Sequence, residues 1–473
     1  MTHGEQVLDI GLDLGTTVTK LTALAEDGTT VVSLSTATTW EEPGDGCAEQ
    51  SPGAVVGAVD DLLARAATAV GTGTSRGRTA VFRSVGLTSL AESGVLVDAD
   101  GQSRSPVIAW FDPRGSHQVA SLTTDFRSAF SARTGLKVSH VPTVFKLAWL
   151  RDNGLDLRGL QWLSLAELVI HHLGGRRVAE RSLMGRTGLL DVHTGGVYQP
   201  SLSHLGVDEA LVPELVWAGM PVGRVARSHP VEAVRGAVLT VAGHDHPVAA
   251  ASAGSSATAS AMDSIGTAEA FVVASRHVPD PAAVLALTDG GISVHPHVVK
   301  GTTALLCGMR TGLVLKRVLC LLGAEGEAER ARLDRAALDL GIGSASDILV
   351  SGFAMSDSDV VVHLGSDSPT PVKVWRAALD HSTDHAAARL AHLSAAGVPI
   401  ERLVLAGGWS GMASVVDARR ALAPVVEVAT LPQPGPRGAA LFGRWAATAP
   451  EDPDGDGRPP AEYFTAADGQ PAP

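Results

Sequence analysis

The chain has few cysteines. The three that occur in 473 residues, Cys47, Cys307 and Cys320, are far apart in the sequence and odd in number. Such spacing excludes a disulfide framework and a cysteine-based metal site, and it is typical of thiols in a reducing compartment.

Positive charge is also scarce. Lysine and arginine number 37 against 50 aspartates and glutamates, the net charge is −13, and the basic runs are no longer than the pairs Arg176-Arg177 and Arg419-Arg420. Because nucleic acids bind positively charged surfaces, we expect no nucleic acid among the partners.

Long apolar runs are missing as well. No apolar segment reaches the roughly 18 residues that a membrane helix needs. The start of the chain, Met1-Thr-His-Gly-Glu-Gln, lacks the basic region of a secretory signal. We therefore expect a cytoplasmic protein that does not bind a membrane.

The composition that is present favours packed α/β layers. Hydrophobic residues make up 45% of the chain, charged residues 18%, and the mean hydropathy is +0.17. A chain of this length is too long for one hydrophobic core, and the usual domain size predicts two or three domains.

The N-terminal pattern predicts three antiparallel strands, an amphipathic helix and a further strand. This β-β-β-α-β order indicates a mixed sheet with helices on its faces. The expected elements are strands over 7–14, 18–24 and 30–34, a helix over 52–70 and a strand over 80–87.

A similar order recurs after residue 259 and predicts a second copy of the same unit. A hairpin opens this copy, and helices and a short strand follow it. The expected ranges are strands over 260–265 and 270–274, helices over 303–322 and 374–395, and a strand over 403–406.

Each copy contains an acidic residue followed closely by Gly-Thr. The two segments are Asp13-Leu-Gly-Thr-Thr17 and Asp263-Ser-Ile-Gly-Thr-Ala268. A turn of this kind presents backbone N–H groups and hydroxyls to phosphates. Two such turns predict a duplicated domain that closes on one nucleotide.

Asp245 lies in the segment Val241-Ala-Gly-His-Asp-His-Pro247. A carboxylate in this position suits a base that accepts a proton from a hydroxyl. The structural alternative is that Asp245 is the N-cap of an alanine-rich helix over 247–254, where a proline follows early.

Six segments together resemble the FGGY family of carbohydrate kinases, in whose order they stand. The resemblance extends over nearly the whole chain, up to about Ala447. The segments are Asp13-Leu-Gly-Thr-Thr-Val-Thr-Lys20, Gly86-Leu-Thr-Ser-Leu-Ala-Glu-Ser-Gly94, Pro106-Val-Ile-Ala-Trp-Phe-Asp-Pro-Arg114, Ala242-Gly-His-Asp-His246, Gly266-Thr-Ala268 and Leu405-Ala-Gly-Gly-Trp-Ser-Gly411.

The resemblance implies an α/β fold of two RNase H-like, actin-like domains, each a mixed β-sheet flanked by helices, with a cleft between them. It divides the chain into a sugar-binding domain over 1–247 and a nucleotide-binding domain over 248–448. Residues 449–473 are poor in apolar side chains, so we expect a flexible tail there.

The implied activity is transfer of the γ-phosphoryl group of ATP to a sugar hydroxyl, with Mg²⁺ as the metal. The acceptor expected first is a ketose, either a pentulose or a hexulose. Asp245 is then the general base. The residues expected to bind the sugar are Glu92, Trp110, Asp112, His244 and His246.

Two of these sugar contacts have structural alternatives. The alternative for Glu92 is a solvated loop carboxylate, and the alternative for Trp110 is a core residue at the end of a strand. Glycerol-binding members of the family carry an Arg-Glu pair where this chain has Ala91-Glu92, which argues against glycerol itself.

The resemblance places Asp13 at the magnesium ion, through a water molecule. Trp409 either stacks on adenine or packs locally, and the sequence leaves both open. The residues expected to bind the nucleotide are Gly15, Thr16, Thr17, Lys20, Gly266, Thr267, Gly407, Gly408, Trp409 and Ser410.

Three alternatives to a ketose kinase stay open at this point. They are a kinase of a short polyol or sugar acid, a non-catalytic binding protein that responds to sugar or nucleotide, and an actin-like ATPase that acts on itself or on a protein partner. Since members of the family often form dimers or tetramers, a homodimer is also expected.

Overall fold

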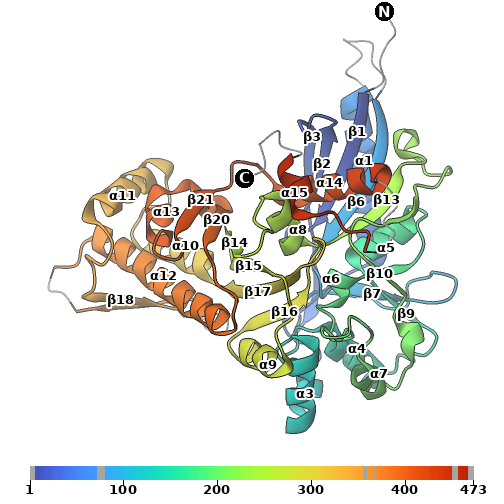
Figure 1. Ribbon diagram of the computed structural model, residues 1–473, viewed down its shortest axis with the longest axis horizontal. Coiled ribbons are helices and arrows are strands. Elements are labelled where there is room, and N and C mark those ends of the chain that lie inside the picture. Colours follow the sequence, from blue (N-terminus) through green and yellow to red (C-terminus); the bar gives the residue numbers. More distant parts are fainter. Residues whose placement is uncertain (1–5, 72–79, 355–358, 366–367, 450–455, 467–473) are drawn as a thin grey trace, which may run out of the picture.

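The structure is a computed structural model that describes residues 6–71, 80–354, 359–365, 368–449 and 456–466. Two six-stranded sheets form the centres of two domains that lie side by side (Figure 1). The first domain contains the blue and green strands on the right of the view, and the second contains the yellow and orange elements on the left.

The first sheet has the strand order β12-β13-β6-β1-β2-β3. Strands β1, β2 and β3 form the expected antiparallel meander, and β6 and β13 run parallel to β1. The bounds are β1 Gln6–Leu14, β2 Val18–Ala25, β3 Thr30–Ala37, β6 Ala80–Ser89, β12 Pro221–Arg224 and β13 Val238–His244.

The second sheet repeats this pattern in the order β16-β17-β15-β14-β20-β21. Strands β14, β15 and β17 are antiparallel, whereas β20 and β21 run parallel to β14. The bounds are β14 Ser260–Ile265, β15 Glu269–Ser275, β16 Ile292–Pro296, β17 Thr303–Met309, β20 Arg402–Ala406 and β21 Val425–Val428.

One expected helix proves to be a strand followed by a helix. Residues 303–309 form β17, and helix α10 begins only at residue 311 and spans Thr311–Leu321. Strand β17 lies between β15 and β16 and is largely buried, so its residues are apolar on both faces. A continuous apolar run of this kind has no periodicity that separates a central strand from a helix.

Helix α14 (Pro434–Thr448) belongs to the first domain although it comes late in the chain. It packs against the first sheet so closely that a Cβ atom on Gly11 would lie 1.8 Å from the Pro436 carbonyl oxygen. A Cβ atom on Gly86 would lie 1.9 Å from the carbonyl oxygen of Ala439. The chain therefore returns to the first domain after it has completed the second.

The other helices cover the sheets and an additional lobe of the first domain. Residues between Leu96 and Val212 supply the separate apolar core of this lobe, while residues 165–173 within that range pack into the core of the first sheet. The longer helices are α1 Pro52–Gly71, α3 Thr124–Thr134, α4 Thr143–Asp152, α5 Leu165–His172, α7 Gln199–Leu205, α8 Asp245–Ser252, α9 Pro281–Asp289, α11 Glu327–Leu340, α12 Pro371–Ala395 and α13 Ala413–Arg419. In the part of the chain that the structure describes, no helix has the length and apolarity needed to span a bilayer.

The described part of the C-terminal segment is packed, in contrast to the flexible tail expected from its composition. Helix α15 (Ala461–Ala466) places the ring of Phe464 5.0 Å from that of Phe442 in α14. The guanidinium of Arg458 stacks 3.7 Å from the ring of Trp217 and donates a hydrogen bond of 2.8 Å to the His297 carbonyl. A few well-placed large side chains thus anchor a segment whose average composition is polar.

Candidate active site

Three acidic residues gather at one edge of the first sheet because three parallel strands end there. The register aligns Leu14 of β1 with Ser89 of β6, and Ser89 with His244 of β13. Asp13 precedes the first of these positions, and Glu92 and Asp245 follow the other two. The carboxyl ends of neighbouring parallel strands meet at the same edge, which makes it a usual place for a ligand site in α/β folds.

Asp245 is the first residue of α8, and the N-cap position belongs to His244, whose side chain makes no capping hydrogen bond. The alternative that Asp245 is the helix N-cap is therefore wrong. The hydrogen bonds to Asp245 from the described residues all end on its Oδ1. They come from the His246 backbone N at 2.7 Å, His246 Nδ1 at 2.8 Å and His244 Nε2 at 3.2 Å. The other carboxylate oxygen is left for a ligand.

The charges around Asp245 keep it ionised. Burial alone would raise the pKa of Asp245, but the charge of His246 and the hydrogen bonds from His244 and His246 hold it well below its usual value. The same contact raises the pKa of His246 against the lowering effect of burial. Both predicted histidines thus contact the predicted base directly.

Asp13 lies close enough to Asp245 for the two charges to interact. Burial and the negative charge of Asp245 raise the pKa of Asp13 to about 7, against the lowering effect of Lys20, its cross-strand partner on β2. The Oδ1 atom of Asp13 is buried without a hydrogen-bond partner among the described residues. Gly435, at the N-terminus of α14, approaches the same carboxylate. A cation or a water bound to a cation would satisfy this oxygen.

The turn after β1 is held in place by side chains from other segments. The indole of Trp40 donates a 2.7 Å hydrogen bond to the Thr16 carbonyl, and the hydroxyl of Thr38 donates one of 2.9 Å to the Gly15 carbonyl. Thr17 is exposed. Such fixed backbone geometry suits a turn that presents its N–H groups to phosphates.

Glu92 is a buried carboxylate that pairs with Arg186, a residue that the sequence reasoning missed. Arg186 donates from Nε at 2.9 Å and from Nη2 at 2.5 Å, and both bonds end on Oε1 of Glu92. Burial would raise the pKa of Glu92, but Arg186 and His244 hold it below its usual value. The alternative of a solvated loop carboxylate is wrong. No local sequence signal links residues 92 and 186, which only the fold brings together.

Trp110 and Asp112 differ in their surroundings. Trp110 is half-buried and donates a 3.0 Å hydrogen bond from its indole to the hydroxyl of Thr16, so it joins the expected sugar wall to the phosphate turn. The Asp112 carboxylate accepts hydrogen bonds from the backbone of Ala48 and from Arg114. These contacts brace the segment that carries Trp110, and a sugar contact by Asp112 stays a prediction.

The Gly-Thr turn of the second domain lies beside the Gly-Gly turn because β14 and β20 are parallel neighbours. Gly407 has φ +90°, and a Cβ atom there would lie 2.4 Å from the Ile265 carbonyl oxygen. Gly312 lies even closer to the Gly-Thr turn, because a Cβ atom on Gly312 would lie 1.6 Å from the Gly266 carbonyl oxygen. Close backbone approach to the Gly-Thr turn therefore requires glycine at positions 312 and 407.

The other residues predicted to bind the nucleotide in the second domain are at least partly accessible to solvent, and Trp409 also packs against a neighbouring tryptophan. Thr267 and Gly408 are exposed, and Ser410 is half-buried. The ring of Trp409 lies 6.2 Å from that of Trp375 at an interplanar angle of 31°. Trp409 thus packs locally, and stacking on adenine stays a prediction for its other face.

Asp263 does not play the part of Asp13 in the second domain. It is fully buried in β14, with Oδ2 3.2 Å from Nε of Arg419, and Arg419 also contacts Glu269 at 2.6 Å. Burial and the charge of Glu269 raise the pKa of Asp263. The second acidic motif therefore contributes to the core of its domain.

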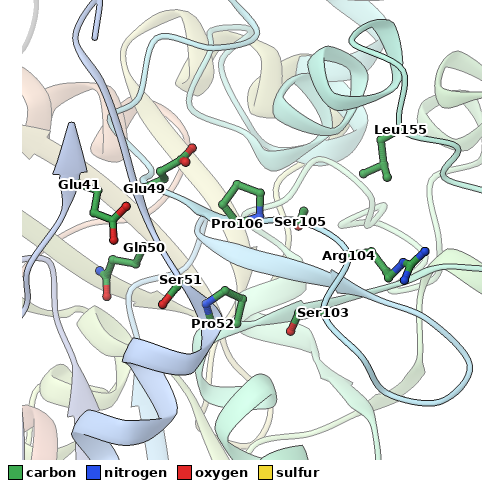
Figure 2. Close-up of a pocket in the computed structure, with 10 residues that line it drawn as sticks. All are labelled: Glu41, Glu49, Gln50, Ser51, Pro52, Ser103, Arg104, Ser105, Pro106 and Leu155. Carbon is green, nitrogen blue, oxygen red and sulfur yellow. The ribbon is translucent and has the colours of Figure 1, made fainter. Parts of the chain in front are cut away.

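A pocket of about 540 Å³ lies elsewhere on the first domain, next to the start of α1 (Figure 2). None of the predicted site residues lines it. Its lining residues are Glu41, Glu49, Gln50, Ser51, Pro52, Ser103, Arg104, Ser105, Pro106 and Leu155. The candidate active site rests on the strand ends described above.

Solved structures share this arrangement of two domains along almost the whole chain. A xylulose kinase from Rhodospirillum rubrum superimposes with a TM-score of 0.80 at 23% identity, and the match covers 97% of this chain and 96% of that one. A Plasmodium falciparum glycerol kinase solved with ADP gives a TM-score of 0.84 at 15% identity, with 99% and 94% covered. These likenesses define the class of protein as one with the two-domain, actin-like fold.

The sequence comparisons define the family. Residues 8–252 match the model of the N-terminal domain of the FGGY family of carbohydrate kinases, and the chain belongs to that family. An L-fuculokinase from Salmonella typhi is 30% identical over 216 residues, which are 45% of this chain and 44% of that protein. A xylulose kinase from Streptomyces rubiginosus is 28% identical over 240 residues, with 50% and 48% covered. The chain thus spans about half the length of the curated relatives it matches.

Proposed function

We propose that this protein transfers the γ-phosphoryl group of ATP to a hydroxyl of a small neutral sugar, with a ketose as the expected class. The observation that carries the proposal is that Asp245 and Glu92 both follow strand ends at one edge of the first sheet. Each carboxylate has one oxygen held by basic side chains, and no side-chain hydrogen bond from the described residues reaches the other. Two oriented acceptor oxygens suit a molecule that carries several hydroxyl groups.

Asp245 is proposed as the base that orients the reacting hydroxyl and removes its proton. Its low pKa makes it a weak base, which is sufficient for phosphoryl transfer because the loose transition state depends mainly on positioning and charge stabilisation. His244 and His246 hold Oδ1, so that Oδ2 is free to accept the hydroxyl hydrogen bond.

The electrostatics of the acceptor side favour a neutral sugar over a sugar acid. The guanidinium of Arg186 is engaged by Glu92 and by Ser293, and Glu92 and Asp245, whose pKa values are both lowered, contribute ionised carboxylates. An anionic acceptor would meet like charges there. Two relatives are named as an L-fuculokinase and a xylulose kinase, and their names supply the ketose class. A short neutral polyol is the second candidate.

The nucleotide is proposed to bind between the two Gly-Thr turns. Gly15, Thr16, Thr17 and Lys20 would approach the phosphates from the first domain, and Gly266 and Thr267 from the second. The Gly407–Ser410 segment would lie under adenine and ribose. The buried, unpaired Oδ1 of Asp13 fits a magnesium ion held through water, which would neutralise phosphate charge.

The proposal is tested by magnesium-dependent release of ADP from ATP over a panel of ketoses, aldoses, polyols and sugar acids. We expect one neutral acceptor to stimulate release. Asp245→Asn should lower turnover by about 10²-fold or more while ATP binding is retained, because the base contacts the acceptor side. Asp156→Asn, in an exposed loop, serves as the matched control.

Two results would contradict the proposal. Stimulation that is equal in wild type and Asp245→Asn would remove Asp245 as the base. ATP binding without stimulation by any acceptor would favour the non-catalytic binding protein. Homodimer formation and a cytoplasmic location also remain predictions, the first measurable by light scattering.

A further inference from the structure

Arg186 joins the two domains through a single guanidinium group. It lies just beyond α6 (Arg181–Met184) in the first domain. Its Nε and Nη2 atoms donate to Oε1 of Glu92, and its Nη1 atom donates to the hydroxyl oxygen of Ser293 at 2.5 Å. Ser293 belongs to β16, at the edge of the second sheet.

The contact with Ser293 has a defined direction. The Ser293 hydroxyl lies 3.2 Å from the Leu306 carbonyl oxygen, to which it donates. Its oxygen is therefore left as an acceptor for Arg186. A planar guanidinium has fixed donor directions. If Ser293 moves, the Arg186 guanidinium therefore tends to move with it, and Arg186 also holds Glu92.

The neighbouring backbone of β16 rests directly on the first domain. The Val294 N–H donates a 2.8 Å hydrogen bond to the Gly135 carbonyl. A Cβ atom on Gly185, next to Arg186, would lie 2.8 Å from Pro296. The Val294–Gly135 hydrogen bond joins the two backbones directly, and side-chain atoms of His295 and Pro296 fill the space against Gly185. Movement of β16 is therefore transmitted to the segment that carries Arg186.

We propose that Arg186 is a positioning residue that orients Glu92 according to the placement of β16, so that an acceptor held by Glu92 stabilises the domain arrangement seen here. The inference rests on the proposed function in assigning the acceptor to Glu92. A ligand shifts a conformational equilibrium only through contacts that differ between the states, and the Glu92–Arg186–Ser293 chain supplies such a contact.

The first test removes only the Ser293 hydroxyl, which is the second-domain end of the Glu92–Arg186–Ser293 hydrogen-bond series. Ser293→Ala keeps the Arg186–Glu92 pair and should raise the acceptor KM about tenfold, as expected for loss of a hydrogen bond to a charged group, while the ATP KM changes less than about twofold. Ser293→Thr retains the hydroxyl and should restore the wild-type KM. Ser275→Ala, on β15 of the same sheet with its own bond to the His277 carbonyl, is the matched control.

A double-mutant cycle separates positioning from a general structural effect. In a Glu92→Gln background, Ser293→Ala should add less than about twofold to the acceptor KM, because the carboxylate that Arg186 orients is already gone. An equal effect of Ser293→Ala in both backgrounds would overturn the proposal.

A ligand-free measurement distinguishes this proposal from the proposed function. Hydrogen exchange at the Val294 amide, which bonds across the domains, should be several-fold faster in Ser293→Ala and Arg186→Met than in Ser275→Ala. If wild type phosphorylates no acceptor but exchange accelerates, the proposed function fails and the domain tie stands. Unchanged exchange in both variants would overturn the tie even in an active kinase.

Discussion

At the residue scale, the candidate site depends on carboxylates that are each fixed through one oxygen. Oδ1 of Asp245 is held by two histidines, and Oε1 of Glu92 is held by Arg186. Fixing one oxygen orients the other without occupying it. A carboxylate whose two oxygens both have protein partners, such as that of Asp112, braces its own segment instead.

Glu92→Gln should raise the acceptor KM about tenfold or more, because the amide replaces an ionised acceptor and leaves Arg186 without its charged partner. The ATP KM should stay within about twofold, which steady-state assays with each substrate varied would measure. Glu49→Gln is the matched control, since Glu49 also pairs with an arginine, Arg114, at 2.6 Å. An unchanged acceptor KM in Glu92→Gln would remove Glu92 from the sugar site.

Lys146 predicts a pH dependence of stability. Its ammonium is buried and donates to the carbonyls of Trp110, His140 and Val141, and burial lowers its pKa to about 8. Between this pKa and the ordinary value of 10.5, the unfolded chain keeps a proton that the folded protein has lost. Stability from this group therefore increases as the pH rises from 8 to 10.5, and it is lost as the pH falls through 8.

This pH dependence is measured by comparing wild type with Lys146→Met, which has no titrating group at this position. The urea midpoint of wild type should rise relative to that of the variant across this pH range, by up to about 3 kcal/mol in unfolding free energy. Parallel pH profiles of the two proteins would show that the Lys146 pKa is not lowered.

At the scale of elements, the first domain depends on how closely α14 approaches β1 and β6. The approach is made possible by Gly11 and Gly86, over which the backbone of α14 passes. It also brings the N-terminus of α14 next to Asp13. A helix N-terminus carries partial positive charge, so α14 contributes both to the core and to the anion-binding character of the site.

Gly86→Ala should destabilise the protein by about 3 kcal/mol or more, since its Cβ atom would overlap the Ala439 carbonyl and the helix would have to move. Thermal and chemical unfolding would measure the loss. Gly57→Ala is the matched control, because Gly57 lies exposed in α1 with open space around it, and we expect it to be neutral or stabilising by about 0.5–1 kcal/mol. Similar midpoints for the two variants would contradict the close packing of α14.

At the scale of the whole molecule, late segments of the chain hold early ones together. Helix α14 returns to the first sheet, and the segment after it reaches both domains through Arg458, which stacks on Trp217 and bonds to the His297 carbonyl. The first domain is therefore built from two separate stretches of the sequence. The expected boundary at 247/248 falls inside α8, which connects the two sheets in the sequence. Helix α14 comes after that boundary in the sequence but packs on the first sheet.

Phe464→Ala tests whether the C-terminal segment contributes to stability. Phe464 is 1% exposed and packs on Phe442, so its truncation should cost about 3–5 kcal/mol and lower the thermal midpoint by several degrees. Phe111→Ala, at a phenylalanine that is 38% exposed, should cost much less. Equal midpoints for wild type and Phe464→Ala would instead support a flexible tail.

The sequence by itself determined the features that arise from short-range patterns. The hairpin with its Gly-Thr turn, the helix expected over 52–70 and found over 52–71, and the duplicated unit follow from periodicity and turn chemistry. The order of six short motifs determined the family. Apolar runs such as 303–309 were beyond this reasoning, because a fully buried strand has no polar face to mark its period.

Only the tertiary structure decided which distant residues share the site. Arg186 reaches Glu92 from 94 positions away, α14 reaches Asp13 from the end of the second domain, and Asp263 turns into the core despite its motif. Charge pairing and close backbone approach depend on distances in space, which strand register and helix packing set. The free oxygens of Asp245 and Glu92, on which the proposed chemistry rests, are a result of that packing.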